Sequence, residues 1–321
     1  MISIIVTSYE GSSLNDISDL FASIKAQTNQ DFEVIYVTEG SEDLYAFVKR
    51  ETFGMNGPAT VVQNDAQTGL AEARNLGASL AKGEIICFVD DDVVLHPFWA
   101  GAVVAALDKG TEIAGITGPA FPLWEVENLN WVPIAFDWLI GCTRWYHSNR
   151  IVEVANCWGM NMAFRRSSFF EVNGFSTGVT EKSRYLRPGA RKRNREEDAG
   201  KAIGIAEDVG ISIKMRRKRL KLCYVPDMLV HHKVYPYRVS AEFVIRRASF
   251  IGFSRRKVRN SLSGPEFKIL EKERGLLFGA AKEILFSRKS VHTNLEDIKK
   301  RIRLTILVLF SLMYGYLFSP I

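Results

Sequence analysis

Residues 83–97 read GEIICFVDDDVVLHP, and this stretch decides the class of fold. The apolar run at residues 84–89 is typical of a buried strand, because β-forming side chains follow one another without polar alternation. Three carboxylates, Asp90, Asp91 and Asp92, follow at once. Adjacent ionised acids repel one another, and a divalent cation bound among them offsets that repulsion. The alternative interpretation is a solvated turn whose acids cap the next element.

Strands and helices alternate before this stretch. The β-rich runs lie at residues 2–7, 32–37 and 59–63, and apolar side chains at helical spacing predict helices over residues 13–27 and 70–83, the second closed by Gly83. Such alternation predicts an α/β fold with a largely parallel, doubly wound sheet. Ligands bind beyond the carboxyl ends of the strands in such sheets.

The carboxyl ends of the predicted strands carry polar side chains. Thr7 and Tyr9 end the first strand, Glu39 ends the second, and the three aspartates end the fourth. We therefore expect these residues to lie along one edge of the sheet.

Composition and charge exclude little by themselves. The chain has 321 residues, 47% of them hydrophobic and 24% charged, which suits one catalytic domain with an appendage. A net charge of +6 is compatible with nucleic acid, a membrane surface or an anionic substrate. The four cysteines have no CxxC spacing and indicate neither a zinc site nor a disulfide framework. The first residues already form a strand pattern and not a secretory signal, so we expect the catalytic part on the cytoplasmic side.

The chain is predicted to divide by composition. We expect a catalytic domain over residues 1–235 with halves at 1–118 and 119–235, basic amphipathic helices over 236–303, and a hydrophobic helix over 304–321. That last segment has eighteen residues without a charge, which is near the lower limit for crossing a membrane. The alternative is a helix that packs on the protein or lies in the membrane interface.

Two further clusters of chemically active residues follow the middle of the chain. Glu207 and Asp208 open a predicted helix, where acids also complement the helix dipole without any catalytic role. His231 and His232 follow a β-like run and either bind a metal or satisfy a backbone group. The basic run at residues 182–198 has no apolar periodicity and is predicted to be an insertion loop.

Taken together, several blocks resemble one family. They occur in order over about residues 2–235: SIIVTSYE, VIYVTEGS, GLAEARNLGASLAKGEIICFVDDDV, NCWGMNMAFRRSSFFEVNGFS and EDVGISIKMRRKRLKLCYVPDMLVHHKV. Their order and content resemble the inverting family 2 glycosyltransferases with the GT-A (Rossmann-like) fold, of the membrane-associated prokaryotic or archaeal type. An ordered series of blocks is far more specific than any one motif.

The resemblance implies a role for each matching position. It implies Asp92 and His232 as ligands of Mg²⁺ or Mn²⁺, and Asp208 as the general base. It implies nucleotide contacts from Thr7, Tyr9, Glu39, Arg74, Asp90 and Asp91. It implies an acceptor site along Gly159, Met160, Asn161 and Glu207. This chain departs from the family pattern at Thr38-Glu39, where an acidic pair is usual, so the resemblance does not imply that an aspartate recognises a uracil base here.

The predicted function is metal-dependent transfer of a sugar, with inversion, from a nucleotide diphosphate to a lipid-linked or surface-glycan acceptor. We expect this to occur at the cytoplasmic face of the cell membrane, with the C-terminal segment as the attachment. One alternative is a nucleotidyltransferase, but residues 7–13 contain one glycine and no lysine. The other is a nucleic-acid-binding protein, for which no recognition motif is present.

Overall fold

The computed structural model describes residues 1–64, 68–108, 110, 112–125, 133–144, 146–177, 180–182, 202–204, 207–261 and 295–318. The described residues form two compact units. The first contains Met1–Phe121, His147–Lys182 and the described part of Lys201–Lys233, and the second contains the described parts of Pro122–Tyr146 and Val234–Ile321. The expected boundaries near residues 235 and 303 stay predictions.

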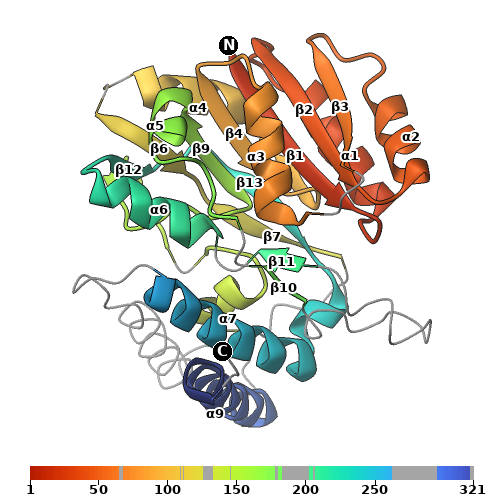
Figure 1. Cartoon of the computed structure of the whole chain (residues 1–321). Coiled ribbons are helices and arrows are strands. Elements are labelled where there is room, and N and C mark those ends of the chain that lie inside the picture. The colour runs from red at the N-terminus through yellow and green to blue at the C-terminus, as the bar shows by residue number, and fades with distance from the viewer. Residues whose placement is uncertain are drawn as a thin grey trace. The chain divides into compact units, whose positions relative to one another are not determined.

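An eight-stranded sheet is the centre of the first unit (Figure 1). Its spatial order is β3 (Ala59–Asn64), β2 (Phe32–Glu39), β1 (Ile2–Tyr9), β4 (Ile85–Val89), β9 (Asn161–Arg165), β6 (Ile113–Thr117), β12 (Lys221–Tyr224) and β8 (Val152–Glu153). The pairs among β3, β2, β1 and β4 are parallel, as is β6 with β12. Strand β9 runs antiparallel to both of its neighbours, and β8 is antiparallel to β12. The predicted α/β class with a mainly parallel sheet is confirmed.

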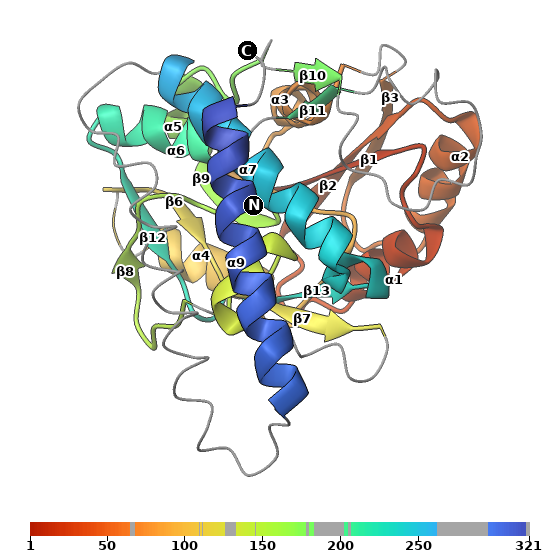
Figure 2. The same cartoon turned by 90° about the horizontal axis from the view of Figure 1, so that it is seen from below.

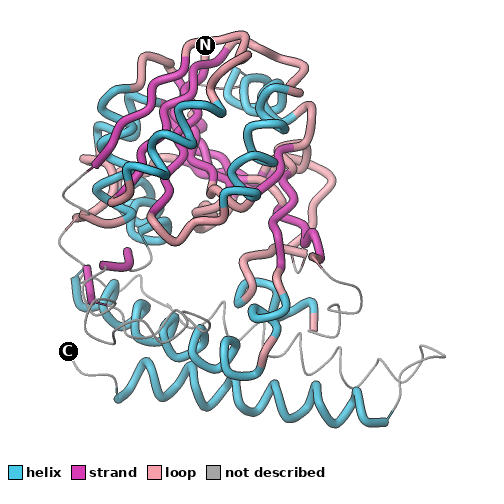
Figure 3. Tube along the Cα trace, turned by 90° about the vertical axis from the view of Figure 1, so that its right-hand side faces the viewer, coloured by secondary structure: helices cyan, strands magenta, loops and turns pink. Residues whose placement is uncertain are grey.

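Helices cover both faces of this sheet, as the tube view shows (Figure 3). Ile4 and Ile5 of β1 are both fully buried but belong to opposite cores, because successive strand residues point to opposite faces. One core includes side chains of α1 (Leu14–Lys25), α2 (Glu42–Glu51) and α4 (Trp99–Asp108). The other includes side chains of α3 (Leu70–Leu80), α5 (Arg166–Glu171) and α6 (Glu207–Arg217).

Helix α3 is shorter than predicted. It ends at Leu80, and Gly83 does not close it. The following backbone turns toward β2, where the N–H groups of Lys82 and Gly83 donate to Glu33 Oε1 at 2.6 and 3.2 Å. A Cβ on Gly83 would lie 2.8 Å from the backbone nitrogen of Ser3, so glycine serves the close approach of this turn to β1.

Shorter elements complete the first unit. Strand β5 (Val93–Leu95) pairs antiparallel with β13 (Val230–Val234), so the histidines expected after a strand lie within one. Strands β10 (Thr180–Lys182) and β11 (Ala202–Gly204) form a two-stranded antiparallel ribbon. Most of the predicted basic loop at 182–198 lies outside the described residues.

The second unit is helical. It contains η1 (Ile134–Leu139), η3 (Pro236–Val239), α7 (Ala241–Ser261) and α9 (Leu295–Phe318), and strand β7 (Ala120–Trp124) enters it. Figure 2 shows α9 packed on α7, and both helices contribute to a core with η1. Among the described helices, none has the length and apolar content to cross a membrane.

Candidate functional site

The ends of β1 and β2 place the predicted nucleotide residues side by side. Tyr9 and Glu39 are partners in the parallel register, and Tyr9 is exposed. Glu39 Oε1 accepts hydrogen bonds from Asn64 Nδ2 at 2.9 Å and from the Gly69 N–H at 3.1 Å. Burial raises the pKa of Glu39 although these donors oppose the rise. Its carboxylate is thus held in one orientation at the sheet edge.

The three aspartates form a turn between β4 and β5, which we call the acid turn (residues 90–92). Ser8 Oγ donates to Asp91 Oδ2 at 2.5 Å and also lies 2.6 Å from the Tyr36 hydroxyl. Burial and then the neighbouring charge of Asp92 raise the pKa of Asp91 to about 7. The raised pKa shows that the ionised form of Asp91 is disfavoured by burial and by its acidic neighbours, and a cation bound beside the turn would relieve this cost.

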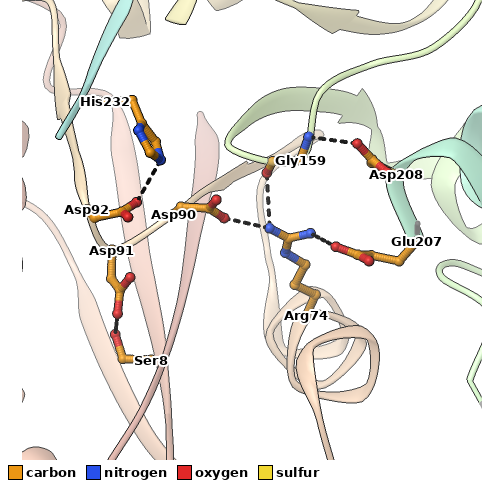
Figure 4. A network of polar contacts seen from close by, with 9 residues as sticks. All are labelled: Ser8, Arg74, Asp90, Asp91, Asp92, Gly159, Glu207, Asp208 and His232. Atoms are coloured by element: carbon orange, nitrogen blue, oxygen red, sulfur yellow. Dashed lines mark hydrogen bonds and ion pairs between the residues drawn. The ribbon is translucent and has the colours of Figure 1, made fainter. Parts of the chain in front are cut away.

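Asp92 faces His232 across the β5–β13 pair. His232 Nε2 lies 3.4 Å from Asp92 Oδ1 (Figure 4). The Lys233 N–H donates to the Asp92 carbonyl at 3.0 Å. His232 is almost fully buried, so its ring is fixed relative to the carboxylate. One carboxylate oxygen and one imidazole nitrogen thus converge on the same space.

This pair of donors fits a divalent cation that takes its other ligands from a diphosphate and water. Mg²⁺ in nucleotide enzymes is commonly held by only one or two carboxylates, and Mn²⁺ also accepts imidazole. Within the described part of the chain, no group of three or more His, Cys, Asp or Glu side chains is suited to hold a metal.

A buried lysine fixes the strand that carries His232. Lys233 Nζ contacts Asp16 Oδ1 at 2.9 Å and also pairs with Asp19, both on α1. Burial lowers the pKa of Lys233, but the hydrogen bonds that Lys233 donates to Asp19 and Asp16 outweigh it and leave the pKa raised. This contact does not follow from any sequence motif, because Lys233 and Asp16 are 217 residues apart in the chain.

Arg74 on α3 connects the acid turn to the second acidic pair. Its Nη2 lies 2.7 Å from Asp90 Oδ1 and 3.0 Å from the Gly159 carbonyl, and its Nη1 lies 2.9 Å from Glu207 Oε1 (Figure 4). The arginine side chain is only 2% exposed. Its expected contact with a nucleotide stays a prediction, whereas its contacts in the structure join two chain segments.

Glu207 and Asp208 begin helix α6, as predicted. Asp208 Oδ2 accepts from the Gly159 N–H at 3.3 Å, and Oδ1 accepts from the Val209 N–H at 2.7 Å. Burial raises the pKa of Glu207, Arg74 opposes the rise, and Asp208 adds to it. The backbone of Gly159 thus donates to Asp208 through its N–H and accepts from Arg74 through its carbonyl.

The remaining predicted acceptor residues differ in exposure. Met160 is half-buried beside Gly159, whereas Asn161 is fully buried. The Asn161 side chain accepts from Trp99 Nε1 at 2.9 Å and donates to the carbonyls of Pro119 and Met228 at 3.2 and 2.6 Å. The side chain of Asn161 therefore serves the fold, and only its backbone remains a predicted part of an acceptor site.

Known proteins resemble this chain over much of its length. A glucosyl-dolichyl phosphate glucuronosyltransferase from Haloferax volcanii is 26% identical over 255 residues, which cover 79% of this chain and 76% of that protein. The mannosyltransferase PcManGT from Pyrobaculum calidifontis, solved with GDP-Man and Mn²⁺, superimposes with a TM-score of 0.63 at 17% identity and covers 99% of this chain and 88% of its own. S. aureus TarS, solved with UDP-GlcNAc, superimposes with a TM-score of 0.54 at 16% identity, which covers 98% of this chain and 81% of the TarS chain.

These structural likenesses establish the GT-A type of fold. The sequence profile of glycosyl transferase family 2 matches residues 3–172, which is more than half of the chain. The matched region contains the acid turn, Arg74 and Gly159. The chain therefore belongs to glycosyl transferase family 2 and is a glycosyltransferase.

Proposed function

We propose that this glycosyltransferase moves a sugar from a nucleotide-diphosphate donor to a lipid-linked acceptor, with a divalent cation and with inversion. The observation that carries the proposal is the Arg74–Gly159 connection. It joins Asp90 of the acid turn to the acids that begin α6 within one network (Figure 4). One group of acids serves the leaving group, and the other serves the incoming alcohol.

The donor occupies the sheet edge in this proposal. Asp92 and His232 would hold the cation, and Glu39 and the end of β1 would contact the nucleoside. A divalent cation supplies Lewis-acid neutralisation of the diphosphate leaving group when it is bound. Mn²⁺ is present in the solved Pyrobaculum mannosyltransferase, which supports a divalent ion here without choosing between Mg²⁺ and Mn²⁺.

Asp208 accepts the proton of the acceptor hydroxyl in this proposal. The Gly159 N–H and the Val209 N–H fix its two oxygens, and each carboxylate oxygen has a second lone pair that is able to accept a proton. General base catalysis of this kind contributes about 10²- to 10⁴-fold to the rate. Direct attack of the hydroxyl on the anomeric carbon inverts that centre, so no covalent enzyme nucleophile is required.

The acceptor class follows from a relative. The Haloferax protein is named for a glucosyl-dolichyl phosphate, which is a lipid-linked sugar. Its likeness to this chain covers about three quarters of both proteins, so a polyprenyl-type phosphate or its glycoside is the acceptor we propose. The sugar and the nucleotide remain to be found by screening.

Two matched substitutions test the proposal. We expect Asp92→Asn and Asp208→Asn each to abolish transfer while the protein remains folded. Asp92→Asn should also weaken metal-dependent binding of the nucleoside diphosphate, whereas Asp208→Asn should retain it. The exposed Asp227 provides a control, because Asp227→Asn removes a carboxylate of the same unit that no described contact links to the site.

Binding is measured by titration calorimetry with and without Mn²⁺, and transfer by release of the nucleoside diphosphate. Transfer at the wild-type rate in Asp208→Asn would exclude this residue as the base. Retention of the anomeric configuration in the product, read by NMR, would exclude direct displacement.

A further inference from the structure

Helix α9 carries a concentration of exposed apolar side chains. Of sixteen large hydrophobic side chains that are exposed among the described residues, six belong to this one helix. Their spacing of mostly three or four residues places them on one face. Single exposed apolar residues are ordinary, but a continuous stripe marks an interaction surface. We call this set the outer stripe, and it consists of Ile302, Ile306, Phe310, Met313, Tyr314 and Leu317.

The opposite face of α9 packs on α7. Leu304, Val308 and Leu312 are buried, and the helices approach closely at two glycines. A Cβ on Gly315 would lie 1.8 Å from the Ser249 carbonyl oxygen, and a Cβ on Gly252 would lie 2.1 Å from that of Leu312. Protein therefore occupies one face of α9, and the packing holds the outer stripe on the other.

The two helices also hold the positive charge of the chain. Helix α7 has six basic and one acidic residue, and α9 has four basic and two acidic residues. Their net charge thus exceeds the +6 of the whole chain. Lys299 and Arg303 are exposed near the start of α9, beside Ile302. An apolar stripe bordered by basic residues complements an anionic lipid surface, where each basic residue contributes about 1 kcal/mol.

We propose that α9 lies in the plane of an anionic membrane, with the outer stripe at the acyl boundary and the basic residues among the headgroups. The stripe from Ile302 to Leu317 is about 22 Å long, at about 1.5 Å per helical residue. Tyr314 suits the boundary, because its ring is apolar and its hydroxyl is polar. A second copy of the chain fits less well, since it would bring two strongly basic helix pairs together.

A membrane contact at α9 would bring the enzyme to the bilayer that holds a lipid-linked acceptor. This link to the acceptor rests on the proposed function. The lipid contact itself rests on α9 and α7 alone. Two separate measurements therefore distinguish the two ideas. Asp208→Asn should bind vesicles like the wild type and fail in transfer, whereas Phe310→Asn should bind vesicles poorly and retain transfer to a water-soluble acceptor analogue.

The test compares two phenylalanines of similar exposure. Phe310 on the outer stripe is 70% exposed, and Phe53 in the first unit is 75% exposed. The full chain is sedimented with vesicles of phosphatidylcholine with and without phosphatidylglycerol. We expect Phe310→Asn to weaken binding to the anionic vesicles about tenfold, since burial of one aromatic side chain is lost, and Ile306→Asn/Phe310→Asn about a hundredfold. Phe53→Asn should bind like the wild type.

Each remaining outcome contradicts the proposal. Undiminished binding by the double variant would show that the stripe does not meet lipid. Equal weakening by Phe53→Asn would show that the effect is not specific to α9. A wild-type dimer that ignores vesicles and dissociates in the double variant would assign the stripe to a second copy of the chain. Light scattering and thermal unfolding of every variant separate these results from misfolding.

Discussion

The acid turn and the first turn of α6 both place adjacent carboxylates in the site, but they hold them differently. In the acid turn, burial and the neighbouring charges raise the pKa of Asp91 to about 7, and Ser8 donates to this carboxylate. At the start of α6, Arg74 directly opposes the rise in the pKa of Glu207. Arg74 pairs with one acid of each group, Asp90 and Glu207. The comparison teaches that Asp91 differs from both, because it is held by a hydroxyl donor beside other carboxylates, where a cationic ligand is proposed.

Removal of Arg74 should produce the largest effect, because both acid groups lose the same cation. We expect Arg74→Met to destabilise the fold by about 3–5 kcal/mol, the usual result when one partner of a buried ion pair is removed. We also expect transfer to fall at least about 100-fold, since Gly159 and Asp208 lose their fixed positions. Urea unfolding and initial transfer rates measure the two effects.

Two variants keep this prediction specific. Arg74→Lys retains the charge but not the planar, forked arrangement of N–H donors. We therefore expect it to recover part of the stability that Arg74→Met loses, and a smaller part of the transfer rate. Arg50 is exposed, and Arg50→Met should change the free energy of unfolding by no more than about 0.5 kcal/mol. Wild-type transfer in Arg74→Met would show that the two acid groups work independently.

Sequence reasoning recovered the parts of this site that depend on local pattern. The strand ends that carry Tyr9, Glu39 and Asp92 follow from apolar runs, and the start of a helix at Glu207 agrees with the acidic pair that opens it. It could not recover the antiparallel insertion of β9 between β4 and β6, because an alternating apolar run has the same pattern in either direction. Nor could it find the role of Arg74, whose partner Glu207 lies 133 residues away.

Buried polar side chains are a second part of the site that the sequence does not reveal. The backbone of Asn161 stays a predicted part of the acceptor site, whereas its side-chain amide holds three distant segments together. The sequence places Ser8 at the end of the first strand but does not show that it supports Asp91, and it gives no sign that Lys233 supports the strand of His232. A sequence motif indicates which segments lie near the site, but the packing decides which of their side chains are buried and which are free to contact a ligand.

The support of the acid turn by Ser8 provides the next effect in size. Ser8→Ala leaves Asp91 without one of its donors, so we expect a loss of about 1–3 kcal/mol of stability. Ser79 is a suitable control, because its hydroxyl is exposed and bonds only within its own helix. Ser79→Ala should change stability by less than about 0.5 kcal/mol. If Ser8→Ala and Ser79→Ala lower the free energy of unfolding equally in chemical denaturation, Ser8 does not stabilise the acid turn.

The pH dependence of stability reports on the α6 pair. The pKa of Glu207 is raised in the folded protein, so its contribution is fully present below pH 4.5 and is lost as the pH rises through the raised pKa. Glu207→Gln lacks this titration. We therefore expect the free energy of unfolding of the variant to gain on that of the wild type as the pH rises above 4.5, and urea unfolding at a series of pH values measures this gain. A constant difference across that range would contradict the raised pKa.

The smallest effect should come from Gly159, which joins the two acid groups through its peptide and not through a side chain. A Cβ there would lie 3.5 Å from Arg74 Nη1 and 3.8 Å from Asp208 Cβ, which is ordinary contact. We expect Gly159→Ala to change stability by less than about 1 kcal/mol. Gly118→Ala is the contrasting variant, because its Cβ would lie 1.8 Å from the Met228 carbonyl oxygen and force the backbone to move.

If the Gly159 backbone borders the acceptor, Gly159→Ala should raise KM for the acceptor and leave donor binding unchanged. A change in donor binding alone would place this peptide on the side of the acid turn.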